Sequence, residues 1–260
     1  MSKTYHHHVP PFSHKSGARI ELHWNIVVPD SPIKPDLDGL WERARFIKLD
    51  NVEVLAFSPE DLFLHLCIHA CSHLQTGLDL IPLFDLAELM KTSADTIDWS
   101  LLMERATSWG GRKCVYLMLL LVRDLLGEAP PDRIMPEMKP ADYRPVFLDE
   151  ALEQIFEASP PAQIMRLRIG LLLKIKKSKR IKNKISALFK AAFPSKEYLA
   201  RFYSVSFSSP KIYLCRLFHP GRLIVRYILV LLRLFRRDQS AIKAVHQEHR
   251  VSEVSDWMFS

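Results

Sequence analysis

The chain has 260 residues, enough to bury a sizeable core, and its 48% apolar and 25% charged composition is typical of a globular protein. Eight glycines against 17 prolines argue against a glycine-rich phosphate loop and against a β-barrel with many tight turns. The net charge of +7 is unevenly distributed, because residues 162–237 contain 19 lysines and arginines and a single acidic residue, Glu197. Such a basic segment favours an anionic partner.

The cysteines and the apolar segments bear on the location of the protein. The chain contains four cysteines, Cys67, Cys71, Cys114 and Cys215. They form no Cys-x-x-Cys pair and lie mostly in apolar helical stretches, so we expect reduced thiols. The N-terminus lacks the pattern of a signal peptide, and the longest apolar stretch, near 223–235, carries Arg226 and Arg233. We expect a cytoplasmic protein, with peripheral association at a membrane as the alternative.

The first 57 residues have the composition of β-strands. Segments 5–9 and 19–28 are rich in β-forming residues and are separated by Pro-Pro and a Ser/Lys/Gly turn, which predicts a strand pair. Segments 46–49 and 52–57 flank an Asp-Asn turn and predict a second hairpin. We therefore assign residues 1–57 to a β region.

A helical pattern begins at Ser58. This residue is a good N-cap, Pro59 suits the first helical position, and the carboxylates of Glu60 and Asp61 face the positive end of the helix dipole, so we expect a helix to about His73. Apolar spacing predicts further helices over 79–90, 97–109, 114–126 and 147–158, with a proline-rich connector over 130–145. Residues 58–160 would form a helical bundle.

The basic region is also predicted to be helical, as an extension over 161–238 followed by a tail over 239–260. Cationic helices are expected over 164–173 and 181–193, then a short helix after Pro194-Ser195 and a last helix from Gly221 to Arg237. In that helix four arginines spaced by 4, 7 and 4 residues share one face opposite apolar residues: Arg222, Arg226, Arg233 and Arg237. The fold class is therefore α+β and mostly α.

The first long predicted helix contains three histidines at positions i, i+4 and i+8: His65, His69 and His73. The rest of this helix is almost entirely apolar, so the histidine line must face groups that satisfy imidazole nitrogens, such as Asp85, Glu88 or the N-terminal strands. The histidines could be structural, or could line a cleft for a substrate or phosphate. A zinc site is the least favoured reading, because a straight helix drifts by ~40° per four residues.

Histidines also occur in the predicted N-terminal strands. Alternation would send His6 and His8 to one face and His7 to the other, and would put Glu21 and His23 together on the next strand. A surface strand with a polar side and a functional wall of acid and imidazole are both compatible with this pattern.

Five motifs occur in a characteristic order. They are YHHHVPP (5–11), ELHW (21–24), LHLCIHA (64–70), LFDLA (83–87) and IDW with ERA (97–106). Over residues 4–128 their order and spacing resemble the uncharacterised bacterial nucleotidyltransferase family of the polymerase-β-like superfamily. The resemblance implies transfer of a nucleoside monophosphate from an NTP to an acceptor that the sequence does not identify. It also implies two Mg²⁺ ions, held by an Asp-x-Asp/Glu pair and a third carboxylate, and a Gly-Ser turn on the triphosphate.

The resemblance assigns roles to individual residues. Glu21 matches the third carboxylate, and so a catalytic Mg²⁺ ligand. The substrate-binding positions that it implies are His6, His8, His23, His65, His69, His73 and Asp85. The Gly-Ser turn and the acidic pair precede the His-His-His segment in the family. Here no glycine is followed by serine, and the single Asp-x-Asp, Asp36-Leu37-Asp38, lies in a proline-rich loop.

We therefore expect an N-terminally truncated or degenerate member that is inactive as this chain, since one carboxylate cannot hold two divalent ions. The alternative is a non-catalytic adaptor that docks through its basic region onto an anionic membrane surface. Nucleic acid is less favoured as the partner, because residues 174–184 contain no aromatic side chain. A metallohydrolase ranks last, because the sequence has no His-Glu-x-x-His motif.

Overall fold

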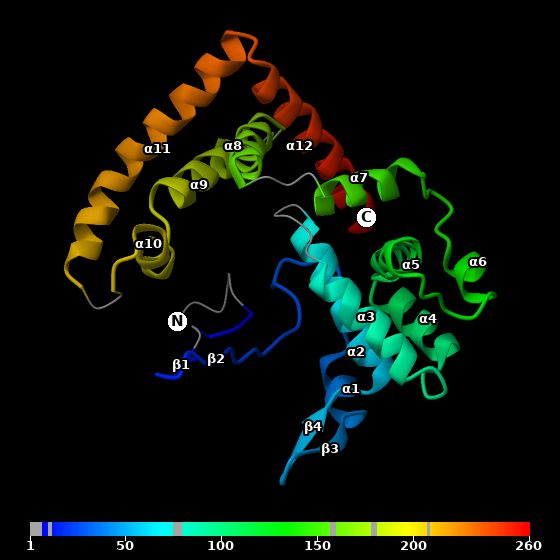
Figure 1. Cartoon of the computed structure of the whole chain (residues 1–260). Coiled ribbons are helices and arrows are strands. Elements are labelled where there is room, and N and C mark those ends of the chain that lie inside the picture. The colour runs from blue at the N-terminus through cyan, green and yellow to red at the C-terminus, as the bar shows by residue number, and fades with distance from the viewer. Residues whose placement is uncertain (1–6, 10–11, 75–79, 157–159, 178–180, 207–208) are drawn as a thin grey trace. The chain divides into compact units, whose positions relative to one another are not determined.

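The computed structural model describes residues 7–9, 12–74, 80–156, 160–177, 181–206 and 209–260. It shows a mostly helical α+β protein whose strands lie near the N-terminus, which confirms the predicted fold class. The chain divides into two compact units, residues 1–158 with 251–260 and residues 159–250 (Figure 1). The four-part division made from the sequence stays a prediction.

The second predicted β-hairpin is present, whereas the first strand pair involves residues 12–13 and not the predicted segment 5–9. Strand β1 (Phe12–Ser13) pairs antiparallel with β2 (Arg19–Ile20), and β3 (Arg45–Leu49) pairs with β4 (Val52–Ala56). Among the described residues, the predicted pairing of 5–9 with 19–28 includes a single bridge, between His8 and His23. The second hairpin turns at Asp50, whose φ of 52° is a left-handed conformation that aspartate tolerates.

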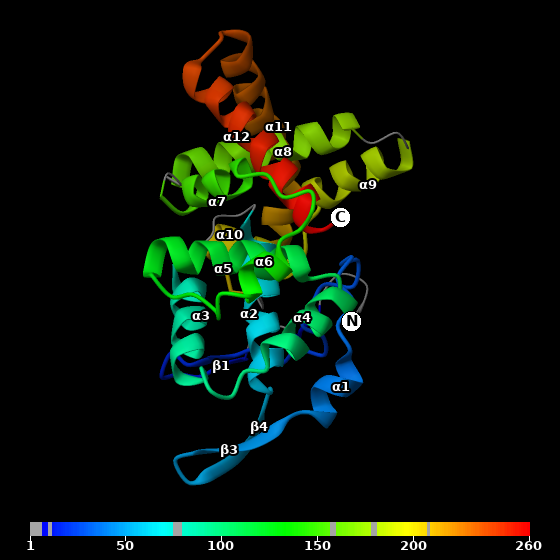
Figure 2. The same ribbon diagram turned by 90° about the vertical axis from the view of Figure 1, so that its right-hand side faces the viewer.

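The β3–β4 hairpin projects away from the helices of the first unit (Figures 1 and 2). Its apolar side chains are largely exposed, among them Phe46, Leu49, Val52 and Leu55. A two-stranded hairpin with exposed apolar faces gains little stability by itself in water.

The helices of the first unit form a bundle around α2 and α5. Their bounds are α1 (Leu37–Glu42), α2 (Pro59–His73), α3 (Ile81–Thr92), α4 (Trp99–Ser108), α5 (Arg112–Leu126), α6 (Ile134–Met138) and α7 (Val146–Phe156). Helix α2 packs against α3, α4 and α5. Helix α5 supplies nine consecutive buried residues, 114–122, and ends at Gly127 with φ of 74°. Residues 130–145 were predicted to form a proline-rich connector, and the structure places the short helix α6 within this segment.

The cysteines belong to this core. Cys67, Cys71 and Cys114 are buried, and all four cysteines are free. Burial raises the pKa of the Cys67 and Cys71 thiols well above the ordinary value, so these side chains behave as small apolar groups.

The start of α2 is held by a buried ionic network. The side chain of Ser58 caps the helix by accepting a hydrogen bond from the Asp61 backbone N–H at 3.2 Å. The carboxylate of Asp61 is fully buried; its Oδ2 accepts from Arg43 Nε at 2.9 Å and its Oδ1 from Arg105 Nη1 at 3.0 Å. Arg43 caps α1 and Arg105 lies on α4, so one carboxylate joins three helices.

Two further contacts extend this network. Arg43 also pairs with the exposed Asp36, the N-cap of α1, at 3.2 Å. Glu60 accepts a hydrogen bond from the backbone N–H of Asp98, the N-cap of α4, at 3.0 Å. The pKa of Arg43 is raised, mainly by the hydrogen bond to Asp61. The network therefore favours the protonated guanidinium of Arg43.

The second unit contains α8 (Pro160–Lys177), α9 (Ile181–Ala192), α10 (Lys196–Tyr203), α11 (Lys211–Phe235) and the first part of α12 (Gln239–Met258). The prediction that a helix opens at Gly221 is wrong, because α11 begins ten residues earlier and contains Pro220. Burial of Ile212, His219 and Val230 along one side of α11 sustains the helix although Pro220 lacks a backbone N–H. Among the described residues, no helix is long and apolar enough to cross a bilayer.

Helix α12 occupies the segment that the sequence assigned to a tail. Its last turns belong to the first unit, where Val254, Trp257 and Met258 are buried. Trp257 stacks on Phe147 of α7 with ring centroids 4.7 Å apart. The apolar residues of α12 are spaced by three and four positions but separated by many polar ones, which weakens the helical signal in the sequence.

We predict that Asp61→Asn lowers the free energy of unfolding by about 3 kcal/mol, because it leaves two partly buried guanidinium groups without their shared anion. Urea denaturation of the full chain measures this loss. Asp36→Asn is the matched control: it removes an exposed partner of the same Arg43, and asparagine is an equally good N-cap. Equal losses in the two variants would contradict the role given to Asp61.

Candidate functional site

The N-terminal histidines are positioned by a short backbone pairing. The Val9 N–H donates to Leu22 O at 2.9 Å, and the Trp24 N–H donates to His7 O at 3.0 Å. This register sets His8 opposite His23 in an isolated antiparallel bridge. Segment 7–9 is therefore tied to residues 22–24 of the ELHW motif.

Three imidazole rings meet at this bridge. The ring centroid of His23 lies 5.0 Å from that of His7 and 4.9 Å from that of His8, and those of His7 and His8 are 5.1 Å apart. The predicted alternation, with His7 on the opposite face from His8, is wrong, because residue 7 lies in a bend and not in a regular strand. His6 lies outside the described residues.

Glu21 lies beside this cluster. Its Oε2 is 3.6 Å from His23 Nε2, and its Oε1 is 4.0 Å from Arg19 Nη2. Glu21 and His23 therefore share a face, as the alternation predicts, and the Glu21 carboxylate keeps 44% of its surface exposed. A carboxylate with this exposure can accept further hydrogen bonds or an ion.

The second set of histidines lies along α2. The ring centroids of His65 and His69 are 5.8 Å apart, and those of His69 and His73 are 4.7 Å apart. His65 is half-buried and also contacts the ring of Phe57, with centroids 5.7 Å apart, whereas His69 and His73 are exposed. The Nδ1 atom of His65 is buried and has no hydrogen-bond partner in the described part of the chain.

The two sets of histidines act on each other electrostatically. The pKa of His65 is lowered from 6.5 to about 4, mainly by burial and also by the neighbouring imidazoles of His69, His23 and His7. Desolvation is also the main cause that lowers the pKa of His69; His73 and His23 add to it, while the Glu21 carboxylate opposes it. Both residues are therefore neutral imidazoles at neutral pH, able to donate one hydrogen bond and accept another.

A cavity of about 490 Å³ lies next to these histidines. His7 reaches it from the N-terminal segment, and His69 and His73 reach it from α2. The lining also includes other residues of α2, residues of the loop over 26–32, and Ser255 and Phe259 near the end of the chain. The sequence did not point to this loop or to the end of the chain, since neither carries a motif of its own.

Asp85 lies apart from this arrangement in the contacts that the structure describes. It is exposed on α3, and no hydrogen bond or ion pair among the described residues joins it to the histidines of α2. Its predicted part in substrate binding stays a prediction.

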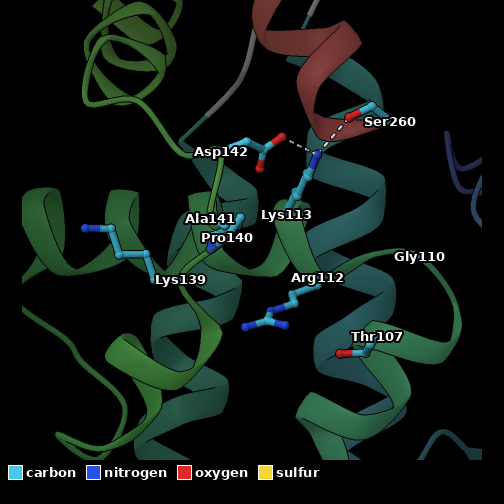
Figure 3. Close-up of a pocket in the computed structure, with 9 residues that line it drawn as sticks. All are labelled: Thr107, Gly110, Arg112, Lys113, Lys139, Pro140, Ala141, Asp142 and Ser260. Carbon is cyan, nitrogen blue, oxygen red and sulfur yellow. Dashed lines mark hydrogen bonds and ion pairs between the residues drawn. The ribbon is translucent and has the colours of Figure 1, made fainter.

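A second pocket of about 400 Å³ opens where α5 begins (Figure 3). Lys113 points across it, with Nζ 2.8 Å from Asp142 Oδ2 and 2.7 Å from Ser260 Oγ. The guanidinium of Arg112 donates to two backbone carbonyls, those of Glu137 and Met138. These cations therefore serve to hold the connector after α6 and the end of the chain against α5.

The described residues do not complete a metal centre. Within the described ranges, no group of three or more His, Cys, Asp or Glu side chains could hold a metal ion. Asp36, the first residue of the Asp-x-Asp sequence, accepts a hydrogen bond from the Gly39 N–H and pairs with Arg43. Glu21 supplies one oxygen donor of the kind that Mg²⁺ prefers, but one carboxylate does not fit a two-ion site.

Comparison with known proteins agrees with the motifs. Residues 1–127 match the family model described as an uncharacterised nucleotidyltransferase. No curated protein and no solved structure matches the chain. The match includes the ELHW segment, the histidine line of α2 and the Arg43–Asp61–Arg105 network. The match supports the assignment of residues 1–127 to a nucleotidyltransferase family.

We predict that His65 makes stability depend on pH. Between pH 6.5 and about 4 the unfolded chain binds a proton at His65 that the folded protein does not bind, so stability falls as pH falls through this window, by up to about 3 kcal/mol. Urea denaturation at several pH values measures the slope, which His65→Gln should make shallower.

Leu89→Ala is the control for this experiment, because it removes a partly buried side chain of α3 without removing a titrating group. It should lower stability at every pH and leave the slope unchanged. A slope that His65→Gln does not alter would contradict the burial of a neutral imidazole at this position.

Proposed function

We propose that this chain provides part of a nucleotidyltransferase site that handles a nucleoside triphosphate, for transfer of a nucleoside monophosphate to an acceptor. The observation that carries the proposal is the position of Glu21 and His23, which act electrostatically on His69 of α2 within a segment that matches the family. The imidazoles of His7, His69 and His73 line a cavity of suitable size for a small ligand, and the Glu21 carboxylate acts on one of them, His69.

The neutral state of His65 and His69 supports this function. A protonated imidazole at His69 would compete with a divalent cation for the Glu21 carboxylate, but a neutral imidazole does not. Their nitrogen atoms can instead exchange hydrogen bonds with the ribose, base or phosphate oxygens of a nucleotide. The buried Nδ1 of His65 adds a polar atom that lacks a hydrogen bond within the described residues.

We also propose that these 260 residues do not catalyse transfer by themselves. Glu21 would be one ligand of a required Mg²⁺ ion, and we derive no chemical step through the metal because the described residues do not complete its ligand set. Asp36 belongs to the Asp-x-Asp sequence of this chain, but its carboxylate caps the N-terminus of α1. Binding without turnover is the expected behaviour.

The exposed strands support a larger catalytic sheet. Apolar side chains of both hairpins face solvent, including Phe12, Ile20, Phe46 and Val52. Strands of this kind are stabilised when further strands or a covering layer bury their faces. We propose that β1–β4 pack in this way in the active enzyme.

Nucleotide binding to the full chain tests the proposal. Titration calorimetry with ATP, GTP, CTP and UTP in the presence of Mg²⁺ should give binding of at least one nucleotide, weakened by about tenfold or more in Glu21→Gln. Glu53→Gln, on the exposed strand β4, removes an equal charge from the same unit and should bind like the wild type.

Turnover is measured in the same samples as release of pyrophosphate, which we expect to be absent. Release by the wild type would contradict the proposed inactivity but not the site. Absence of binding for all four nucleotides, or equal binding by Glu21→Gln, would overturn the assignment of the site to a nucleotide.

A further inference from the structure

Helix α11 has two different apolar sides. One side is buried within the second unit through Ile212, His219 and Val230. At 100° per residue, a second group of apolar side chains occupies the remaining face, and all of them are exposed: Tyr213, Leu214, Leu217, Phe218, Ile224, Val225, Ile228, Leu229, Leu231, Leu232 and Phe235. Packing within the unit therefore accounts for only one of the two sides.

The exposed face of α11 is bordered by positive charge. The helix contains five basic residues, Lys211, Arg216, Arg222, Arg226 and Arg233, and no acidic residue. The last three fall within a narrow stripe along one edge of the apolar face, because they are spaced by four and seven residues. Arg222 and Arg226 also lie over the ring of Phe202, at 5.4 and 5.1 Å from its centroid, which ties this stripe to α10.

Helix α9 repeats the pattern on a smaller scale. Its exposed apolar side chains are Ile181, Ile185, Leu188 and Phe189, which share one face at helical spacing. Lys182 and Lys184 flank this face, and Lys190 lies opposite, so that α9 also contains no acidic residue. Two neighbouring helices of one unit thus combine an exposed apolar face with basic flanks.

We propose that the second unit docks on the surface of an anionic lipid bilayer, with the apolar faces of α11 and α9 inserted among the lipid chains and the lysines and arginines at the headgroups. Exposed apolar faces of this extent indicate a binding surface, and their basic borders match the charge of anionic lipids. The charge of the whole segment agrees, since Glu197 is the single acidic residue within 162–237.

Two other occupants fit the surface less well. A second copy of the chain would bring two sets of basic residues together without acidic partners within α9 or α11. Nucleic acid would engage the charges but leave the aliphatic side chains of α11 exposed to water, since bases stack on aromatic side chains and not on leucine, isoleucine or valine.

Vesicle flotation of the full chain tests this proposal. Vesicles of equal parts phosphatidylcholine and phosphatidylglycerol should bind the protein, and vesicles of phosphatidylcholine alone should bind it weakly. Raising the salt from about 0.05 M to about 0.5 M should weaken but not abolish binding to the anionic vesicles, because salt screens the charges and leaves the apolar contribution.

Phe218→Glu tests the contribution of the apolar face of α11 separately from that of the basic residues. It should weaken binding to the anionic vesicles by about tenfold or more. Phe46→Glu is the matched control, because Phe46 is 72% exposed on β3 and Phe218 is 68% exposed on α11. Phe235→Glu, at the other end of α11, provides an independent variant, and circular dichroism checks that each variant keeps its helical content.

Several results would overturn the proposal. They are an absence of binding to the anionic vesicles, equal weakening by Phe46→Glu and Phe218→Glu, and binding of a single-stranded oligonucleotide without binding of vesicles. Sedimentation velocity tests whether the face binds a second copy of the chain. A dimer that dissociates in Phe218→Glu, together with an absence of vesicle binding, would assign the exposed face of α11 to a second copy.

Discussion

The buried carboxylate of Asp61 is the interaction on which the arrangement of the first unit depends. It has no exposed surface and is held by two guanidinium groups, from the end of α1 and from α4. Because a buried charge is tolerated only when it is paired, the three helices must keep this meeting point. The direction of α2 is set there, and with it the face on which His65, His69 and His73 lie.

Local chemistry could be predicted from the sequence, but long-range pairing could not. Ser58 and Pro59 identify the start of α2 because capping acts within a few residues. The partners of Asp61 lie 18 and 44 residues away, and no local pattern connects them. The start of α11 was misplaced for a related reason: tertiary burial of Ile212 and His219 outweighs the helix-breaking tendency of Pro220.

The candidate site shows the same division. Helical spacing predicts that three histidines share one face of α2, and strand alternation predicts that Glu21 and His23 share another. The electrostatic coupling of His69 to His23 and Glu21, which lie 46 and 48 residues earlier in the chain, was not predictable, nor was the contribution of Ser255 and Phe259 to the cavity. The family match over residues 1–127 agrees with the motifs, whereas the depressed pKa of His65 follows from burial that only the fold supplies.

The central claim is that the N-terminal segment and α2 form one site, in which the Glu21 carboxylate acts on His69. Measuring the pKa of His69 by NMR titration, in the wild type and in Glu21→Gln, tests it most directly. Glu21 favours the protonated form of His69, so removing its charge should lower the pKa of His69 further below 6.5. An unchanged pKa in Glu21→Gln would contradict the account, since the two side chains would then belong to separate surfaces.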